Sequence, residues 1–267
     1  MNNSNRTVWI VVAVVVALLL CCCVLVVGVA VAGLLAAGPL TQGGGIGRVE
    51  ERTEQIITVG EAPMLEVDNF AGDLVVFRGE DEQMRIITTK RANSSSRLDQ
   101  ITVAISEREE GVRIEASHPG MEIGNVSVRF EIYVPADAQV DLHTGAGNVQ
   151  TADVEGKISV HTGAGNVRVQ GAAAPVTLEA GAGEIDYEGQ PKGTCTFDNG
   201  AGNITLGLPQ EVNIEVKLTT GIGNVNVSGF DVDGRVSNTE VDGVIGTGED
   251  ATIMAHTGVG NVALNPR

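Results

Sequence analysis

Apolar and polar residues alternate along the second half of the chain in short runs that are interrupted by pairs of glycines. On both sides of each glycine pair every second residue is apolar, which is the period of a β-strand with one buried face. The sequence Gly-x-Gly recurs, with its second glycine at steps of 18, 18, 19, 21 and 37 residues. Such a period predicts a β-solenoid, in which each repeat forms one coil of about 18 residues and is buried only against its neighbours. The predicted fold class is therefore all-β, and the long last step predicts a degenerate copy near Gly243.

The glycines and asparagines of these repeats are predicted to form the turns between the strands. Glycine adopts positive φ angles that other residues resist. The asparagines are expected to form a ladder along one corner of the coils, interrupted by Glu184, that holds the stacked strands in register. The predicted turn residues are Gly147, Asn148, Gly165, Asn166, Gly183, Gly202, Asn203, Gly223, Asn224, Gly260 and Asn261.

The N-terminal part of the chain is apolar throughout, because residues 8–37 form 30 consecutive positions without a charge. A membrane-spanning helix needs about 20 such residues, whereas the apolar core of a signal peptide has about 7–15. Residues 8–37 are therefore predicted to be one transmembrane helix in contact with the lipid bilayer. The triplet Ala30-Val31-Ala32 resembles a cleavage site and leaves removal of the segment open. Arg6, with no acid near it, favours a cytoplasmic N-terminus and a single-pass protein of the cell membrane whose C-terminal body lies outside the cytoplasm.

The pattern divides the chain into five parts. Three successive glycines mark a flexible linker after the apolar run. The next region alternates less regularly and holds one distant copy of the repeat around Gly72, so it is predicted to be an irregular entry cap of the solenoid. The predicted parts are the tail 1–7, the transmembrane helix 8–37, the linker 38–54, the β entry cap 55–135 and the regular repeats 136–267.

Charge and composition narrow the range of partners. All 34 acidic residues and 16 of the 17 basic residues follow residue 37, so the formal charge of that region is −18. An acidic body repels the phosphates of nucleic acid and of anionic lipid. Only 3% of the residues are aromatic, which leaves no stacking platform for bases, and nucleic acid is not an expected partner. Cys195 is the single cysteine of this region and falls on an inward position, which predicts a core residue without a disulfide.

The residue two positions before each glycine pair is polar and is predicted to point outward. In four successive repeats this residue is His143, His161, Glu179 or Asp198. Equivalent residues in stacked coils lie about 5 Å apart. The column therefore suits a solvated face, and also a weak metal site or a pH-responsive ladder of histidines and carboxylates. His256 holds the equivalent position but is expected to lie several coils away.

Other motifs do not predict chemistry. The Gly-x-Gly pairs lack the third glycine and the following helix of a dinucleotide site. Calcium-binding β-rolls need aspartate where this chain has Val167 and Ile204. Carbohydrate-active β-helices use paired carboxylates in a groove built by long loops, and the predicted turns are short. We therefore expect no catalytic residue, no cofactor and no enzymatic activity.

The last repeat is followed only by Asn265-Pro266-Arg267. An uncovered terminal coil exposes backbone donors and acceptors that can pair with another chain. The sequence thus predicts self-association or partner docking through the C-terminal coil, opposed by the high net charge.

Three parts of the sequence carry a resemblance to a known family. They are Leu-Glu-Val-Asp-Asn-Phe-Ala-Gly-Asp at 65–73, Tyr-Val-Pro-Ala-Asp at 133–137 and the serial Thr-Gly-Ala-Gly-Asn units. Residues 55–265 resemble the bacterial putative-adhesin domain, a β-solenoid family related to the head GIN domain. The resemblance implies a non-catalytic, surface-exposed adhesin or structural protein of the cell envelope, whose partner is a cell-surface or envelope protein or a glycan. The alternatives are an envelope-stress sensor or regulatory module that binds a peptide or protein, and, least favoured, a carbohydrate-active β-helix enzyme.

Overall fold

The computed structural model describes residues 48–120 and 126–267. The predicted transmembrane helix 8–37 lies outside the described residues, as do the tail 1–7 and most of the linker. Among the residues described, no helix is both long and apolar enough to cross a membrane. All of the described residues belong to one compact unit, Thr41–Arg267.

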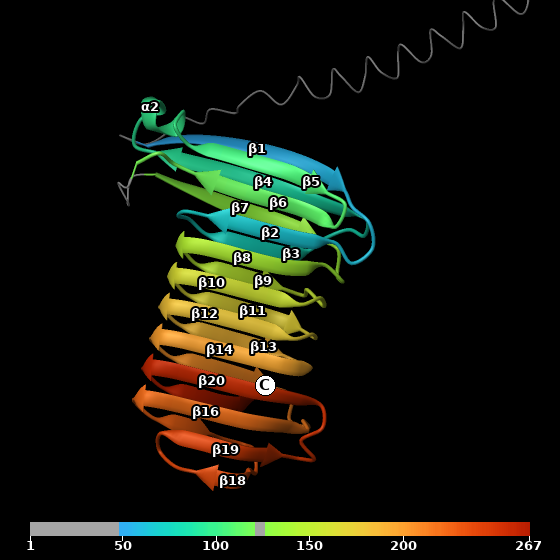
Figure 1. Cartoon of the computed structure of the whole chain (residues 1–267), viewed down its shortest axis with the longest axis vertical. Coiled ribbons are helices and arrows are strands. Elements are labelled where there is room, and N and C mark those ends of the chain that lie inside the picture. Colours follow the sequence, from blue (N-terminus) through green and yellow to red (C-terminus); the bar gives the residue numbers. More distant parts are fainter. Residues whose placement is uncertain (1–47, 121–125) are drawn as a thin grey trace, which may run out of the picture. The chain divides into compact units, whose positions relative to one another are not determined.

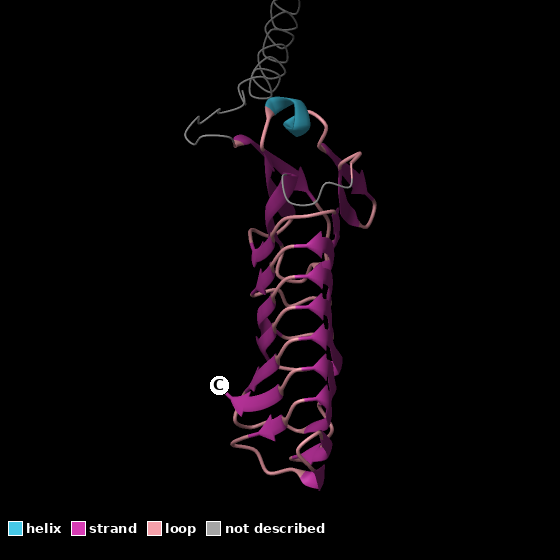
Figure 2. Ribbon diagram, turned by 90° about the vertical axis from the view of Figure 1, so that its left-hand side faces the viewer, coloured by secondary structure: helices cyan, strands magenta, loops and turns pink. Residues whose placement is uncertain are grey.

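The regular repeats fold as coils of a β-solenoid, which confirms the predicted fold of this part of the chain. Each coil places one strand in a ten-stranded sheet, here called sheet A, and one in an eleven-stranded sheet, here called sheet B. Figure 2 shows the two layers of strands joined by turns. The coils, each given with its sheet B strand first, are β8 (Gln139–Ala146) and β9 (Val149–Ala152), β10 (Ile158–Ala164) and β11 (Val167–Ala172), β12 (Val176–Ala182) and β13 (Ile185–Gly189), β14 (Gly193–Ala201) and β15 (Ile204–Leu208), β16 (Ile214–Ile222) and β17 (Val225–Val227), and β20 (Ala251–Val259) and β21 (Val262–Pro266).

The core lies between the two sheets and is built from the inward residues of every coil. Leu142, Val160 and Leu178 stand in register on adjacent strands of sheet B, and each is fully buried. Burying one such side chain contributes about 1.5–3 kcal/mol relative to leaving it exposed. Cys195 is also fully buried, as the sequence predicts for a core residue, and burial raises the pKa of its thiol.

The order of the coils in space differs from their order in the chain at the C-terminal end (Figure 1). Strand β20 pairs in parallel with β14 on one side and with β16 on the other. Strand β21 likewise lies between β15 and β17. The last coil of the sequence therefore fills a place between two coils that precede it.

The segment between β17 and β20 does not form the degenerate coil predicted near Gly243. It forms a hairpin of β18 (Asp233–Val236) and β19 (Glu240–Ile245), and β19 runs antiparallel to β16. The sequence around Gly243 alternates like one strand, but the Gly-x-Gly-Glu at 246–249 is followed by Asp250 and not by the apolar residue that begins the second strand of a repeat. The hairpin takes the position after β16 in sheet B, and the chain then returns to fill the inner place.

The predicted open edge on the C-terminal coil is therefore wrong. Both strands of that coil are paired on both sides, so they have no free row of backbone donors and acceptors. At this end of sheet B the outermost strand is β18, which has four residues, all exposed. A short edge strand of this kind offers little length for pairing with another chain.

The entry cap contains two further coils and an antiparallel cover. Strands β2 (Met64–Asn69) and β3 (Leu74–Arg78) form the distant copy around Gly72. They lie between β8 and β9 on one side and β6 (Gly111–Ser117) and β7 (Val126–Val134) on the other. The remaining elements are β1 (Val49–Thr58), β4 (Gln83–Ala92), β5 (Thr102–Arg108) and the short helix α2 (Ser95–Leu98).

Strand β1 begins inside the predicted linker, so residues 49–54 are strand and not linker. The flexible linker is predicted from the three glycines, but the charged residues that follow them form an antiparallel ladder with β4. Glu50 contacts Arg91 at 3.0 Å, and Glu54 contacts Arg85 at 2.6 Å. Opposite charges on directly facing residues, such as Glu50 and Arg91, favour strand pairing by about 0.2–1 kcal/mol, whereas the contact between Glu54 and Arg85 is diagonal.

Candidate functional site

The four residues of the predicted column stand on adjacent strands of sheet B. His143 faces His161, His161 faces Glu179, and Glu179 faces Asp198 in the parallel register. Their strands β8, β10, β12 and β14 lie side by side in Figure 1. The period-two alternation turns the preceding and following residues into the core, which leaves this column on the outer face.

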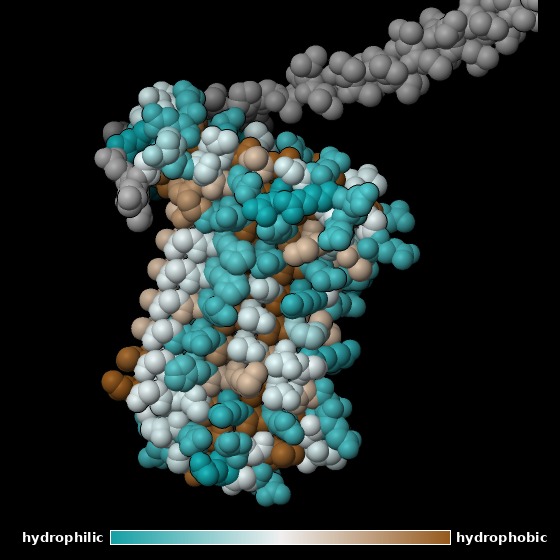
Figure 3. All heavy atoms as spheres, viewed as in Figure 1, coloured by the Kyte–Doolittle hydropathy of each residue, from teal (hydrophilic) through white to brown (hydrophobic). Residues whose placement is uncertain are grey.

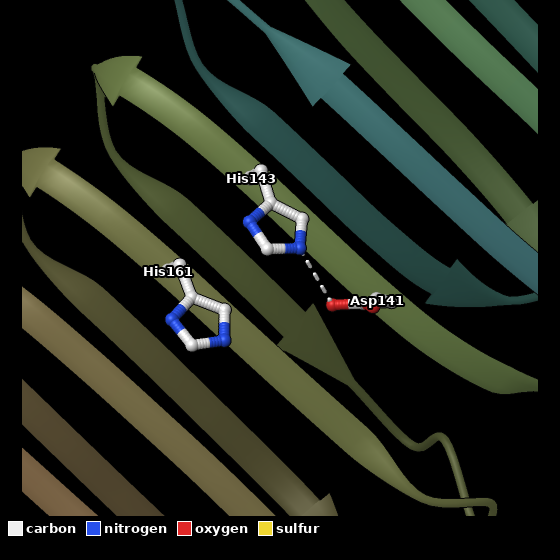
Figure 4. A group of neighbouring side chains, drawn as sticks. All are labelled: Asp141, His143 and His161. Carbon is white, nitrogen blue, oxygen red and sulfur yellow. Dashed lines mark ion pairs between the residues drawn. The ribbon is translucent and has the colours of Figure 1, made fainter.

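The centre of the column is a tight group of titratable side chains (Figure 4). The rings of His143 and His161 are stacked, with centroids 4.7 Å apart and planes within 6°. His143 Nε2 lies 3.1 Å from Asp141 Oδ1. His161 Nδ1 lies 2.9 Å from Glu179 Oε2.

His256 lies much nearer to the column than the sequence suggests. It faces Asp198 directly, because β20 is inserted next to β14. On its other side it faces Thr219, whose Oγ1 is 2.9 Å from His256 Nδ1. The expectation that His256 would be several coils away is therefore wrong, and its cause is the threading of the last coil.

Two acidic residues of this face were missed in the sequence. Asp68 on β2 faces His143 and extends the column by one coil. Aligning the distant copy on Gly72 places Asp68 at the column position, so the signal was present. Asp141 precedes His143 by two residues, and the strand period alone puts both side chains on one face.

The column lines a groove of about 570 Å³ on the face of sheet B. Small residues next to the column, such as Thr144, Gly145 and Gly163, also line it. Figure 3 shows hydrophilic residues along the middle of this face and paler residues toward the edge where the strands end. The groove lies on strands that are hydrogen-bonded on both sides, so its shape is set by the stacked coils. The lining residues are Asp68, His143, Thr144, Gly145, His161, Thr162, Gly163, Glu179, Ala180, Gly181 and Asp198.

The predicted turn residues lie in a single row at one corner of the coils. The six second glycines of the repeats have φ angles from +136° to +153°. The row of asparagines is a ladder in which the backbone N–H of one coil donates to the side-chain oxygen of its neighbour. Asn166 N donates to Asn148 Oδ1 at 3.1 Å, and Asn261 N donates to Asn203 Oδ1 at 2.9 Å. Glu184 N also donates to Asn166 Oδ1, at 2.9 Å.

Three side chains near the groove follow the order of a nucleophile, a base and a carboxylate. Ser159 Oγ lies 3.4 Å from His161 Nε2, and His161 Nδ1 lies 2.9 Å from Glu179 Oε2. Acyl transfer also needs hydrogen-bond donors for the developing oxyanion. Strand β10 is paired with β8 and β12 along its length. Its backbone N–H groups therefore donate hydrogen bonds to the neighbouring strands and are not available to an oxyanion. The arrangement therefore supports polar binding better than nucleophilic catalysis.

Comparisons with known proteins match both the sequence and the fold. The family model described as Toastrack DUF4097 matches residues 43–265. A putative cell adhesion protein from Clostridium sporogenes is 17% identical, with a TM-score of 0.52, over 81% of this chain and 100% of that one. A putative adhesin from Bacteroides fragilis is 12% identical, with a TM-score of 0.31, over 80% of this chain and 97% of that one. Among curated proteins no match is found. The family match and the likeness in fold to the Clostridium sporogenes protein agree with the β-solenoid family of the resemblance, whereas the adhesin role and the relation to the head GIN domain stay predictions.

Proposed function

Because this chain belongs to the Toastrack DUF4097 family, we propose that it is a non-catalytic binding protein of the cell envelope. In this proposal residues 8–37 anchor the chain in the membrane and the solenoid is displayed outside the cytoplasm. The outer face of sheet B, with the column from Asp68 to His256, is its contact surface. The partner is an extended segment of a cell-surface or envelope protein that carries positive charge.

The observation that supports this proposal most strongly is the groove beside the column. It is open and polar, and it runs across several equivalent strands. A repeated row of equivalent groups suits a ligand that is itself extended, because each coil can make a similar contact. Such a groove is poorly suited to enclosing a small substrate, which enzymes usually surround on most sides.

The charge of the groove determines the kind of partner. Asp68, Glu179 and Asp198 line it, and no lysine or arginine is among the lining residues within 48–120 and 126–267. With neutral histidines the lining carries three negative charges. Complementary charge mainly increases the rate of association and the specificity of binding, so a cationic segment is favoured over a neutral one.

Removing these three charges is expected to weaken the binding of a cationic probe. The variant Asp68→Asn, Glu179→Gln, Asp198→Asn should bind fluorescent oligolysine less tightly than the unmodified full-length chain in a mild detergent. Exposed ion pairs contribute about 0.2–1 kcal/mol each, so the expected loss is about 2 kcal/mol, or roughly 30-fold in Kd. Fluorescence anisotropy at low salt measures this change.

A charge-matched control separates the groove from the net charge of the chain. The variant Asp231→Asn, Asp233→Asn, Glu249→Gln removes three exposed carboxylates outside the groove. It should keep most of the affinity. Equal losses in the two variants would show that oligolysine binds the acidic surface at large, and the groove would lose its assigned role.

The proposed orientation has its own test in intact cells. Protease added outside cells that express the full-length chain should remove the solenoid, because the proposal places it outside the cytoplasm. Immunodetection of the C-terminal region before and after cell lysis measures this. A solenoid that is digested only after lysis would reverse the orientation.

A further inference from the structure

We propose that Asp141, His143 and His161 bind a divalent transition-metal ion such as Zn²⁺. All three side chains lie on the outer face of sheet B, within reach of solvent. The inference depends on the geometry of this cluster and does not require that the face bind a protein partner.

The three donor groups already lie close together. One ligand atom from each residue can be chosen so that all three atoms lie within 4.8 Å of one another. Asp141 Oδ1 and His143 Nε2 are 3.1 Å apart. Two ligands of a tetrahedral ion with bonds of about 2.1 Å are separated by roughly 3.4 Å. This pair therefore needs little adjustment, and a turn of the His161 ring would complete the set.

The backbone fixes the positions from which the three side chains extend. Asp141 and His143 are two residues apart on β8, and His161 faces His143 on β10. Both strands are paired on both sides within sheet B. Sites built on such elements are more precise than sites on loops. The adjustment is left to the side chains, of which His161 is 36% exposed.

Glu179 positions His161 for metal binding. A carboxylate only accepts hydrogen bonds, so the 2.9 Å contact with Glu179 Oε2 places a proton on His161 Nδ1. When His161 is neutral, Nε2 then carries the free lone pair. Metal-bound histidines are commonly held in this way by a carboxylate on the far nitrogen. Glu179 is thus a positioning residue and not a ligand in this proposal.

The donor set indicates which ions the site would hold. Two imidazole nitrogens and one carboxylate oxygen favour Zn²⁺, Cu²⁺, Ni²⁺ or Co²⁺, whereas Mg²⁺ and Ca²⁺ prefer oxygen ligands alone. Three protein ligands leave one position of a tetrahedral ion for water.

Titration of the full-length chain with Co²⁺ tests the site directly, because its visible absorption reports the coordinating atoms. We expect a saturable spectrum of nitrogen and oxygen ligands that Zn²⁺ abolishes by competition, since Zn²⁺ binds such sites more tightly than Co²⁺. Binding by the thiols of Cys21, Cys22 and Cys23 would instead give intense sulfur charge-transfer bands. A spectrum composed only of those bands would overturn the proposal.

Matched variants locate the ion. His143→Asn and His161→Asn should each weaken Co²⁺ binding by at least about tenfold. His256→Asn alters the same column outside the cluster and should leave binding unchanged. Glu179→Ala should also weaken binding by about tenfold, and Glu179→Gln, whose amide oxygen still accepts from Nδ1–H, should restore most of it. If His143→Asn and His161→Asn bind Co²⁺ as the unmodified chain does, the cluster is a hydrogen-bonded group without a metal.

Discussion

Gly165→Val is expected to lower the free energy of unfolding by about 2–6 kcal/mol, since backbone strain and steric overlap each cost about 1–3 kcal/mol. Gly165 has a φ angle of +146°, which side chains rarely adopt. A Cβ at this position would also overlap the carbonyl oxygen of Gly147 in the neighbouring coil. Neither coil can retreat, because their strands are hydrogen-bonded on both sides of the turn. Chemical denaturation of the full-length chain measures the loss.

Two substitutions calibrate this prediction. Gly60→Val adds the same side chain at a position where no heavy atom of the described residues lies within 4 Å of the new Cβ, so it should change stability little. Asn166→Ala removes one acceptor from the ladder and should cost about 1 kcal/mol. A Gly165→Val variant as stable as Gly60→Val would contradict the close stacking of the turns.

Ending the chain after Asp250 is expected to cost on the order of 10 kcal/mol, which is comparable to the whole stability of an ordinary domain. The truncation removes β20 and β21, and with them the buried Ile253, Val262 and Leu264. It also leaves an empty place between β14 and β16, so backbone groups on both sides of the gap lose their partners. The hairpin of β18 and β19 and the adjoining coil of β16 and β17 should become sensitive to protease. The melting temperature of the whole solenoid should also fall strongly.

A shorter truncation is the control. Ending the chain after Leu264 removes only Asn265, Pro266 and Arg267 and keeps every buried residue of the last coil. Its cost should be about 1 kcal/mol, from a few hydrogen bonds. If the longer truncation lost only its own coil and left β16 and β17 fully protected, the inserted position of the last coil would be wrong.

The local structure of the solenoid follows from the sequence because each repeat obeys the same simple rules. Alternation gives the strands, and the glycine pairs give the turns with positive φ. The register between neighbouring strands follows as well, because equivalent residues such as His143 and His161 face each other when coils of equal length are stacked. The distant copy around Gly72 follows the same alignment, although its turn has aspartate in place of asparagine.

The order of the coils could not be predicted in the same way. All repeats present similar edges, so local patterns do not tell which coil is the neighbour of which. Contacts between β14 and β20 join residues that are nearly 60 positions apart, and only the packing of the entire stack selects them. The hairpin of β18 and β19 closes the stack after β16, which leaves the inner place for the end of the chain.

The candidate site contains residues that the repeat predicts and neighbours that depend on the order of the coils. His143, His161, Glu179 and Asp198 were found from the repeat alone. Asp141 does not follow from the repeat, because the repeat defines a single column, whereas the same face of β8 also carries the residue two positions before His143. His256 is the neighbour of Asp198 only because the last coil is inserted next to β14, and the repeat does not predict that insertion.

Site-specific photo-cross-linking in intact cells tests the central claim, that the outer face of sheet B is the contact surface. A photoreactive residue at Thr177 would lie on that face in β12, and one at Thr205 would lie on sheet A in β15, where it is exposed. At both positions the photoreactive residue replaces a threonine, and the two threonines lie on opposite faces of neighbouring coils. We expect cross-links to an envelope protein from position 177 and few from position 205. Cross-links that form equally at both positions, or mainly at position 205, would contradict the proposed binding face.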